Sequence, residues 1–200
     1  MEGLTVPFTA IPKALIPGVT TATLVCSSGS PTFKKKEGTP MSIAAVRTYF
    51  AQFGMEDNVL EFETSSATVA LAAQAVGVIP ARIAKSLSFK VGGKAILIIT
   101  AGDAKVDNAK YKAFFHTKAK MLTPDEVTAL IGHAIGGVCP FAIQEGVDVY
   151  LDVSMQRFDT VFPAAGSANS AIELTCAQME QYACNCKGWG DFCKGWQEEG

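Results

Sequence analysis

One ten-residue segment concentrates the residue types that could take part in chemistry. Residues 132–141 read GHAIGGVCPF and contain one of the chain's two histidines, a cysteine, three glycines and a proline. Adjacent glycines let the backbone approach a ligand closely, and the proline fixes the direction in which the chain leaves the loop. An imidazole could transfer a proton there, and a thiolate could attack a carbonyl carbon. By itself, however, a loop rich in glycine and proline is more often structural than functional.

A lysine inside a strand pattern is the second candidate. Residues 84–90, AKSLSFK, alternate as a half-buried strand does, with Leu87 and Phe89 on the apolar face and Lys85 near the start. A second glycine-bearing turn, AGSAN, follows at residues 165–169. Neither segment carries a known phosphate-binding glycine motif.

The charge of the chain is unevenly distributed. Residues 85–120 contain eight lysines and two aspartates, which gives +8 − 2 = +6, whereas the whole chain carries −2 and the remainder therefore −8. This asymmetry favours a positive face that binds phosphates, and the alternative is a solvated lysine-rich surface. The lysines expected to contact phosphates are Lys105, Lys110, Lys112, Lys118 and Lys120.

The six cysteines do not indicate a disulfide scaffold or a metal site. Six in 200 residues are too few for a disulfide-rich fold, so we expect reduced thiols and a cytoplasmic protein. Cys184, Cys186 and Cys193 lack the paired spacing of zinc ligands, and we predict no metal and no cofactor. No run of about 18 apolar residues is present that would predict a membrane span.

The pattern changes near Met41. Residues 1–40 hold five prolines and no sustained periodicity, and we interpret them as an extension, a leader or an upstream mis-start. We expect residues 41–200 to form the functional domain. The helices predicted within it are 42–54, 65–77 with serine caps, 105–115, 123–132 and 175–183, and the strands are 59–63, 84–90, 94–101, 147–155 and segments of 160–174.

Helix 123–132 has the clearest start signal. Thr123 can cap it, Pro124 suits its first position, and Glu126 completes a capping box. Gly132 then ends this helix and opens the ten-residue loop. Because strands and helices alternate irregularly, the pattern predicts an α+β domain with a mixed sheet rather than a doubly wound parallel sheet.

Three segments, ARIAKSLSF (81–89), GHAIGGVCPF (132–141) and AGSANSAIEL (165–174), resemble the successive motifs of the YbaK/EbsC family. That family comprises free-standing relatives of the editing domain inserted in bacterial prolyl-tRNA synthetases. The likeness runs from about Met41 to the end of the last predicted helix. It implies a largely antiparallel mixed sheet curled into a partial barrel, and a cofactor-independent enzyme that hydrolyses mischarged aminoacyl-tRNA.

The resemblance also implies a site. Lys85 matches the family's lysine near the terminal adenosine, and Gly136, Gly137 and Pro140 match its loop around the aminoacyl group. Gly132 and His133 match the GH of the prolyl-editing and alanine-type branches. Ser86 and Cys139 depart from the residues frequent at their positions, which leaves the amino acid open. Further substrate contacts are expected from Val138, Phe141, Gly166, Ser167 and Asn169.

The implied partner is aminoacyl-tRNA, of the tRNA-Pro type and carrying a small amino acid such as alanine or cysteine, with prolyl-tRNA synthetase as a second candidate partner. His133 either positions the loop or transfers a proton. Two other functions stay open at this point. One is a hydrolase with Cys139 as nucleophile and His133 as base, and the other is a non-catalytic RNA-binding module that uses the lysines.

Overall fold

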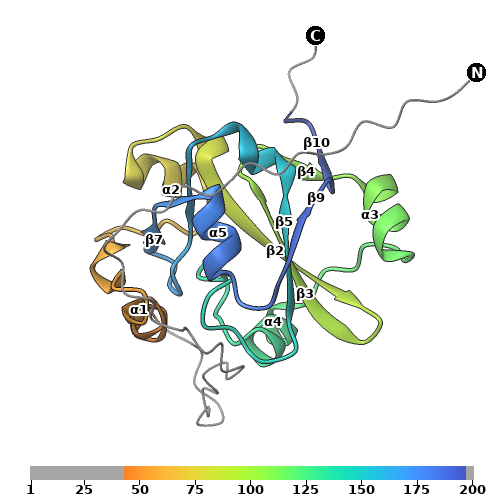
Figure 1. The fold of residues 1–200 in the computed structure, drawn as a ribbon, viewed down its shortest axis with the longest axis horizontal. Coiled ribbons are helices and arrows are strands. Elements are labelled where there is room, and N and C mark those ends of the chain that lie inside the picture. Colours follow the sequence, from red (N-terminus) through yellow and green to blue (C-terminus); the bar gives the residue numbers. More distant parts are fainter. Residues whose placement is uncertain (1–42, 197–200) are drawn as a thin grey trace, which may run out of the picture. The chain divides into compact units, whose positions relative to one another are not determined.

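The computed structural model describes residues 43–196, and the predictions about residues 1–40 lie outside this part of the chain. Figure 1 shows a twisted central sheet with helices around it. The sheet has six strands in the order β8-β6-β2-β3-β5-β9. Their bounds are β2 (Ile83–Val91), β3 (Lys94–Ala101), β5 (Asp148–Asp152), β6 (Thr160–Pro163), β8 (Leu174–Thr175) and β9 (Cys186–Gly190).

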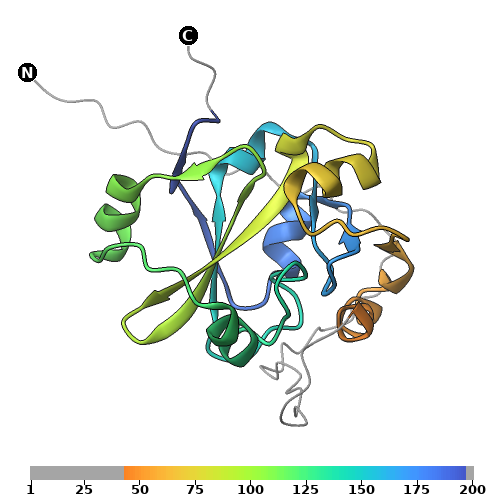
Figure 2. The ribbon, with the colours of Figure 1, turned by 180° about the vertical axis from the view of Figure 1, so that it is seen from behind.

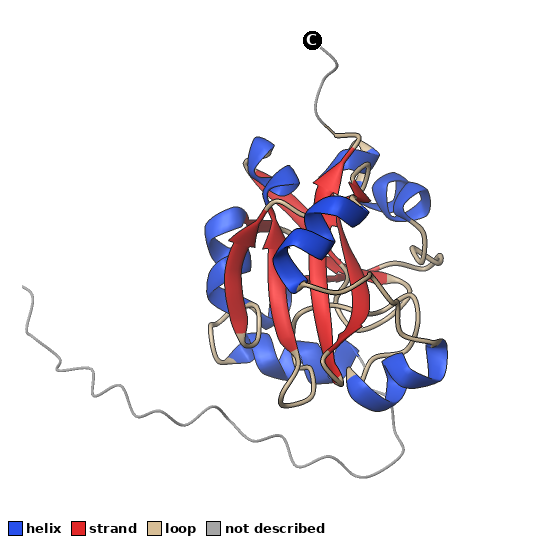
Figure 3. Ribbon diagram, turned by 90° about the vertical axis from the view of Figure 1, so that its right-hand side faces the viewer, coloured by secondary structure: helices blue, strands red, loops and turns tan. Residues whose placement is uncertain are grey.

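The sheet is mixed, as the sequence predicted. Strands β2 and β3 are antiparallel, as are β6 and β8, whereas β2 with β6, β3 with β5 and β5 with β9 are parallel pairs. Two short antiparallel pairs stand outside it: β1 (Val59–Glu61) with β7 (Ser170–Ile172), and β4 (Lys105–Val106) with β10 (Cys193–Lys194). Figure 3 shows the strands side by side with helices in front of and behind them, so the predicted α+β class is confirmed.

The β2–β3 hairpin forms the centre of the sheet. Gly92 and Gly93, both at positive φ, make its two-residue turn, which is the backbone geometry that tight hairpins require. The register pairs Lys85 with Thr100 and Ser86 with Ile99. Every residue of β3 after Lys94 is buried, as expected for a strand covered on both faces.

Within residues 43–196, five helices surround this sheet: α1 (Ile43–Ala51), α2 (Val69–Val76), α3 (Asn108–Phe115), α4 (Pro124–Leu130) and α5 (Cys176–Tyr182). The predicted capping box of α4 is present, with the Thr123 hydroxyl accepting from the Glu126 N–H and the Glu126 carboxylate accepting from the Thr123 N–H. Helix α2 is capped by Thr68 rather than by a serine, and Gly77 ends it in the left-handed conformation. Figure 2 shows α2 beside the start of β2, at the other side of the sheet from α3.

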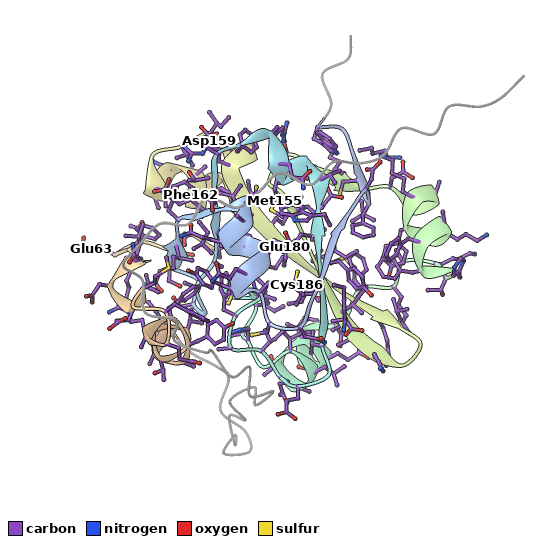
Figure 4. All side chains as sticks on the ribbon, in the orientation of Figure 1. Glu63, Met155, Asp159, Phe162, Glu180 and Cys186 are labelled. Atoms are coloured by element: carbon purple, nitrogen blue, oxygen red, sulfur yellow. The ribbon has the colours of Figure 1, made fainter. Side chains whose placement is uncertain are left out.

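The core has two parts. The larger surrounds the sheet, and the smaller joins Ala73 of α2, Ile83 of β2 and Phe162 of β6. Figure 4 shows Phe162 near α2, while Met155, which is fully buried, lies closer to the middle of the sheet. No helix within residues 43–196 is long and apolar enough to cross a membrane.

Three element predictions need correction. Residues 105–115 do not form one helix, because Lys105–Val106 pairs with β10 and Asp107 caps a helix that begins at Asn108. Strand β5 ends at Asp152, whose carboxylate accepts from the Ser154 N–H and starts the 3-10 turn η3 (Val153–Arg157). The sequence predicted no strand after residue 183, whereas β9 and β10 lie there. Two further 3-10 turns are η1 (Glu56–Asn58) and η2 (Pro80–Arg82).

Candidate functional site

One cavity of about 270 Å³ lies between the start of β2, the residues at the start of α2 and the glycine loop. Its lining residues include Lys85 and Gly136, which come from two of the three segments that the sequence singled out. The remaining walls are small or apolar side chains and hydroxyl groups: Ser66, Ala67, Thr68, Val69, Ala72, Ile83, Ala84, Ser86, Ser88, Met121, Leu122, Pro124, Val127, Ile135, Val138, Phe162, Ala164, Ser170 and Ala171. This lining contains no carboxylate and no imidazole.

The residues at the start of α2 occupy the middle of the site. A Cβ added to Gly136, which has φ +90°, would lie 3.2 Å from the Ala67 Cβ. A Cβ added to Gly102, in the turn between β3 and β4, would lie 2.7 Å from the Val69 side chain and 2.1 Å from the Pro80 carbonyl oxygen. The glycine loop and the β3–β4 turn therefore both approach this segment, and both approaches depend on a missing side chain.

The last glycine of the loop, Gly137, contacts backbone instead of the cavity. A Cβ on Gly137 would lie 2.7 Å from the carbonyl carbon of Gly166 and 2.7 Å from the Ser167 nitrogen. Two of the predicted segments, 132–141 and 165–169, thus pack directly against each other. Gly137 and Gly166 are buried and are not among the residues that line the cavity.

His133 and Cys139 lie behind the loop. His133 is fully buried, and its Nε2 is 2.8 Å from the Phe141 carbonyl oxygen and 3.4 Å from the Cys139 Sγ. Because a carbonyl only accepts, Nε2 carries the proton, and the buried Nδ1 has no partner among the described residues. Burial lowers the pKa of His133, although the hydrogen bond to Phe141 partly opposes this. This geometry favours a structural role for the imidazole.

The Cys139 thiol is poorly suited to be a nucleophile. It is completely buried, and burial raises its pKa to about 12. Almost no thiolate is present near neutral pH at such a pKa, and the thiolate is the reactive form. Pro140 and Phe141 are buried as well, and Phe141 packs edge-on against Phe50 with ring centroids 4.8 Å apart. Gly132, also buried, has φ +97° where the chain leaves α4.

The Lys85 ammonium is held at the β3–β4 turn. Its Nζ donates to the Ala104 carbonyl at 2.6 Å and, at 3.4 Å, to the Gly102 carbonyl. Burial lowers the pKa of Lys85, and the nearby Cys193 and Asp103 partly oppose the shift. The lysine lines the cavity, and its ammonium is directed to this turn.

Ser86 offers a hydroxyl group to the cavity. Its Oγ is buried, and it has no hydrogen-bond partner in the described part of the chain. Leaving a buried hydroxyl unpaired costs about 1–3 kcal/mol, so such a group is well placed to bind a polar ligand. Ser88, two residues further along the same strand, also lines the cavity and is 7% exposed.

Residues 166–169 support the walls from outside. The Asn169 side chain donates to the Phe62 carbonyl at 2.8 Å, and the Ser167 hydroxyl donates to the Asn169 side-chain oxygen at 2.9 Å. The Ser66 N–H donates to the Ala168 carbonyl at 2.6 Å. These bonds fasten the residues that precede α2, and the neighbouring Ala164, Ser170 and Ala171 line the cavity in place of the predicted residues.

The mouth of the cavity is apolar, and two lysines, Lys118 and Lys120, lie close to it in the sequence. Met121 and Ile135 line the cavity and are 57% and 59% exposed. Lys105, Lys112, Lys118 and Lys120 are exposed and form no ion pair with any described residue, and Lys112 and Lys118 border a second hollow beside α3. Lys110 differs, because its ammonium bonds the Asp191 carboxylate at 2.7 Å and the Cys193 carbonyl at 2.8 Å.

Sequence reasoning missed the residues around Thr68, the pair Met121–Leu122, and Ser88. Serine at alternate positions of an otherwise apolar strand was a usable signal, because a hydroxyl on a buried face needs a partner. The residues before α2 carried no comparable signal, since Ser66 and Thr68 look like ordinary helix caps. No three potential metal ligands come together within residues 43–196.

Comparison with known proteins identifies relatives of this chain. The family model described as the aminoacyl-tRNA editing domain matches residues 63–182. The chain is 55% identical over 158 residues to the uncharacterized protein YwhH of Bacillus subtilis, across 78% of this chain and all of YwhH.

Two further similarities involve prolyl-tRNA synthetase. The chain is 31% identical over 86 residues to a proline–tRNA ligase of Geobacillus kaustophilus, an alignment that spans 42% of this chain and 15% of the ligase. A crystal structure described as a proposed trans-editing enzyme for prolyl tRNA synthetase has a TM-score of 0.69 and 28% identity, and the match covers 76% of this chain and 97% of that one.

The packing of the two loops predicts the effect of Gly137→Ala. The added methyl group would meet three backbone atoms of residues 166–167 within 2.8 Å, and backbone cannot rotate away as a side chain can. We expect the substitution to lower the free energy of unfolding by about 2 kcal/mol, measured by urea denaturation. An unfolding free energy equal to that of the unchanged protein would show that the loops do not pack in this way.

The raised pKa of Cys139 predicts an unreactive thiol. At pH 8, site-resolved alkylation with iodoacetamide should leave Cys139 unmodified in the folded protein and label it rapidly in urea, because only unfolding removes the burial that raises its pKa. The partly exposed Cys184 provides the comparison within the same sample. Fast labelling of native Cys139 at neutral pH would instead support a nucleophile.

Proposed function

Because the chain belongs to the aminoacyl-tRNA editing domain family, we propose that it hydrolyses the ester bond of mischarged aminoacyl-tRNA, acting in trans on a small amino acid. The cavity that Lys85, Ser86 and Gly136 line is the observation that carries this proposal. It brings a cationic residue, an unpaired hydroxyl and a glycine backbone together in a space that suits an amino acid.

The size of the cavity supports a small substrate. Most of its lining residues are alanine, serine, glycine, threonine or valine, and its volume is about 270 Å³. An added methylene changes binding in a well-fitting pocket by only about 1–3 kcal/mol, so editing sites select by excluding what does not fit. Alanine and cysteine are the side chains we expect to enter. The match to part of a proline–tRNA ligase supports tRNA-Pro as the carrier and the synthetase as a second partner.

The chemistry requires stabilisation of a developing oxyanion. Ester hydrolysis places negative charge on the carbonyl oxygen, and one fixed backbone donor against it is worth about 2.7–4 kcal/mol. The backbone at Gly136 is the candidate donor, because no side chain separates it from the cavity. The ammonium of Lys85 can bind the phosphate or the ester of the terminal nucleotide.

No carboxylate or imidazole lines the cavity among the described residues. The lining therefore offers no side chain that could serve as the general base for the attacking water. With His133 and Cys139 buried behind the loop, we infer that the ribose hydroxyl next to the ester assists the attacking water. Both the Cys/His hydrolase and the mechanism with His133 as base are less well supported, because neither side chain borders the cavity.

The tRNA would lie across the lysines. Lys118 and Lys120 lie within three residues of Met121 at the cavity mouth, so a strand of nucleic acid entering the cavity would pass them. A non-catalytic RNA-binding module is the remaining alternative. It predicts binding without release of amino acid, and no observation in the site favours it.

The decisive experiment is a deacylation assay with a panel of mischarged tRNAs. We expect release of a small amino acid from tRNA-Pro, and a single-turnover rate about 100-fold lower for Lys85→Ala, because the substitution removes a positive charge beside the reacting end. The control is Lys90→Ala, a lysine of the same strand that pairs with Glu126 at 3.2 Å. If the protein binds every tRNA of the panel but hydrolyses none, the RNA-binding module is the better interpretation. If Lys85→Ala keeps full activity, the cavity at Lys85 is not the active site.

The lysines can be tested by salt dependence. Replacing Lys105, Lys112, Lys118 and Lys120 by alanine should weaken tRNA binding and reduce the slope of log K against log salt, by roughly 0.7–0.9 for each phosphate that the variant no longer neutralises. Lys110→Ala is the matched control, because its charge is already engaged by Asp191. A slope unchanged by the four substitutions would show that these lysines do not contact phosphates and are ordinary solvated surface residues.

A further inference from the structure

The β3–β4 turn presents two carbonyl groups to the Lys85 ammonium. They belong to Gly102 and Ala104, so they stand on either side of Asp103. An ammonium has three donors, and two of them are engaged here. The third has no acceptor among the described residues, and it is the one left for a ligand in the cavity. The direction of that donor therefore depends on where the turn holds the two carbonyls.

Arg157 holds this turn from the other side. Its guanidinium forms an ion pair with the Asp103 carboxylate, and the two side chains are 29% and 35% exposed. The same guanidinium donates to the Trp196 carbonyl at 2.8 Å and to the Ser154 carbonyl at 3.0 Å. It also lies over the rings of Phe158 and Trp196, 4.7 and 5.5 Å from their centroids.

A second hydrogen bond ties the turn to the same element. The Ala101 N–H donates to the Ser154 hydroxyl at 3.1 Å, and Ser154 is fully buried. The 3-10 turn η3, which contains Ser154 and ends at Arg157, thus binds both Ala101, the last residue of β3, and Asp103 in the turn that follows. Asp152 extends this connection, because its carboxylate accepts from the N–H groups of Ser154 and Phe192 at 3.0 and 2.7 Å.

The ion pair with Arg157 also keeps the Asp103 carboxylate from binding the Lys85 ammonium. The carboxylate is close enough to raise the pKa of Lys85, yet it forms no ion pair with the lysine in the described structure. A free Asp103 carboxylate could turn toward the ammonium and occupy its third donor. By engaging the carboxylate, Arg157 leaves that donor available.

We propose that Arg157 is a positioning residue for Lys85: its guanidinium holds Asp103, and through Asp103 it fixes the two carbonyl groups that hold the ammonium and leave its third donor free for a ligand. This rests on the proposed function for the role of Lys85. The charged and titratable groups that face the ammonium are Asp103, Lys105 and Cys193.

The test uses the full chain with Arg157→Ala, Arg157→Lys and Asp103→Asn, and Arg47→Ala as the matched control. Arg47 forms a surface ion pair with Glu61 at 3.5 Å and does not contact the β3–β4 turn. In single-turnover deacylation, Arg157→Ala should be about tenfold slower while the affinity for the tRNA changes less than about twofold. Arg157→Lys should restore part of the rate, because lysine keeps the charge but not the planar set of donors.

An NMR titration of the Lys85 side chain supplies a readout that general destabilisation would not produce. The pKa of Lys85 should rise in Arg157→Ala, where the freed carboxylate acts on it alone, and fall in Asp103→Asn, where the negative charge is gone. Arg47→Ala should leave it unchanged. Should Arg157→Ala fail to fold, Asp103→Asn still tests the proposal, because it removes the ion pair and leaves the other contacts of Arg157.

Unchanged rates in the folded variants, or a Lys85 pKa that is the same in all of them, would overturn the proposal. The two readouts separate it from the proposed function. If no aminoacyl-tRNA is hydrolysed by the unchanged protein, the proposed function fails, while opposite pKa shifts in the two variants would still support the Arg157 contact. If hydrolysis occurs and depends on Lys85 but not on Arg157, only the positioning role fails.

Discussion

The backbone packing of residues 136–137 against residues 166–168 is the constraint on which the rest of the candidate site depends. Gly137 leaves no room for a methyl group against the backbone of Gly166 and Ser167, and Gly136 lies close to Ala67 and Ala168. Two loops and the residues before α2 therefore close around one small space. Because packed interiors tolerate little added volume, this closure depends on residues that lack or nearly lack a side chain.

Few polar side chains line this small space. The Lys85 ammonium is fixed by carbonyls of the β3–β4 turn, and the hydroxyl of the next residue, Ser86, has no partner among the described residues. His133 and Cys139 look like the most reactive side chains in the sequence, yet both are buried behind the wall and bond to the Phe141 carbonyl. In the proposed mechanism their contribution is to hold the loop, and the chemistry is assigned to backbone, lysine and substrate.

Local signals in the sequence were sufficient for much of the fold. The capping box at Thr123, the Gly92–Gly93 turn and the alternation in residues 84–90 each act within a few residues, so the elements they define could be predicted. Strands β9 and β10 could not, because Gly188 and Gly190 weaken the strand pattern and the pairing partners lie far away in the sequence. The α+β class followed from the irregular order of the elements.

The site was only partly predictable for the same reason. Lys85 and the glycine loop could be selected by residue type, but the carbonyls that orient the lysine come 17 and 19 residues later in the chain. The segment 66–69 meets Gly136 across a much longer separation, and caps such as Thr68 carry no mark of a ligand. The burial of His133 was equally hidden, since a histidine in a glycine-rich loop is normally solvated.

The most direct test of the account is a crystal structure of the protein with a non-hydrolysable alanyl-adenosine analogue. We expect the alanyl group inside the cavity, with its carbonyl oxygen against the backbone at Gly136, the Ser86 hydroxyl paired, and the adenosine near Met121 and Ile135. An analogue bound elsewhere, or one that contacts His133 and Cys139 after the loop has opened, would contradict it.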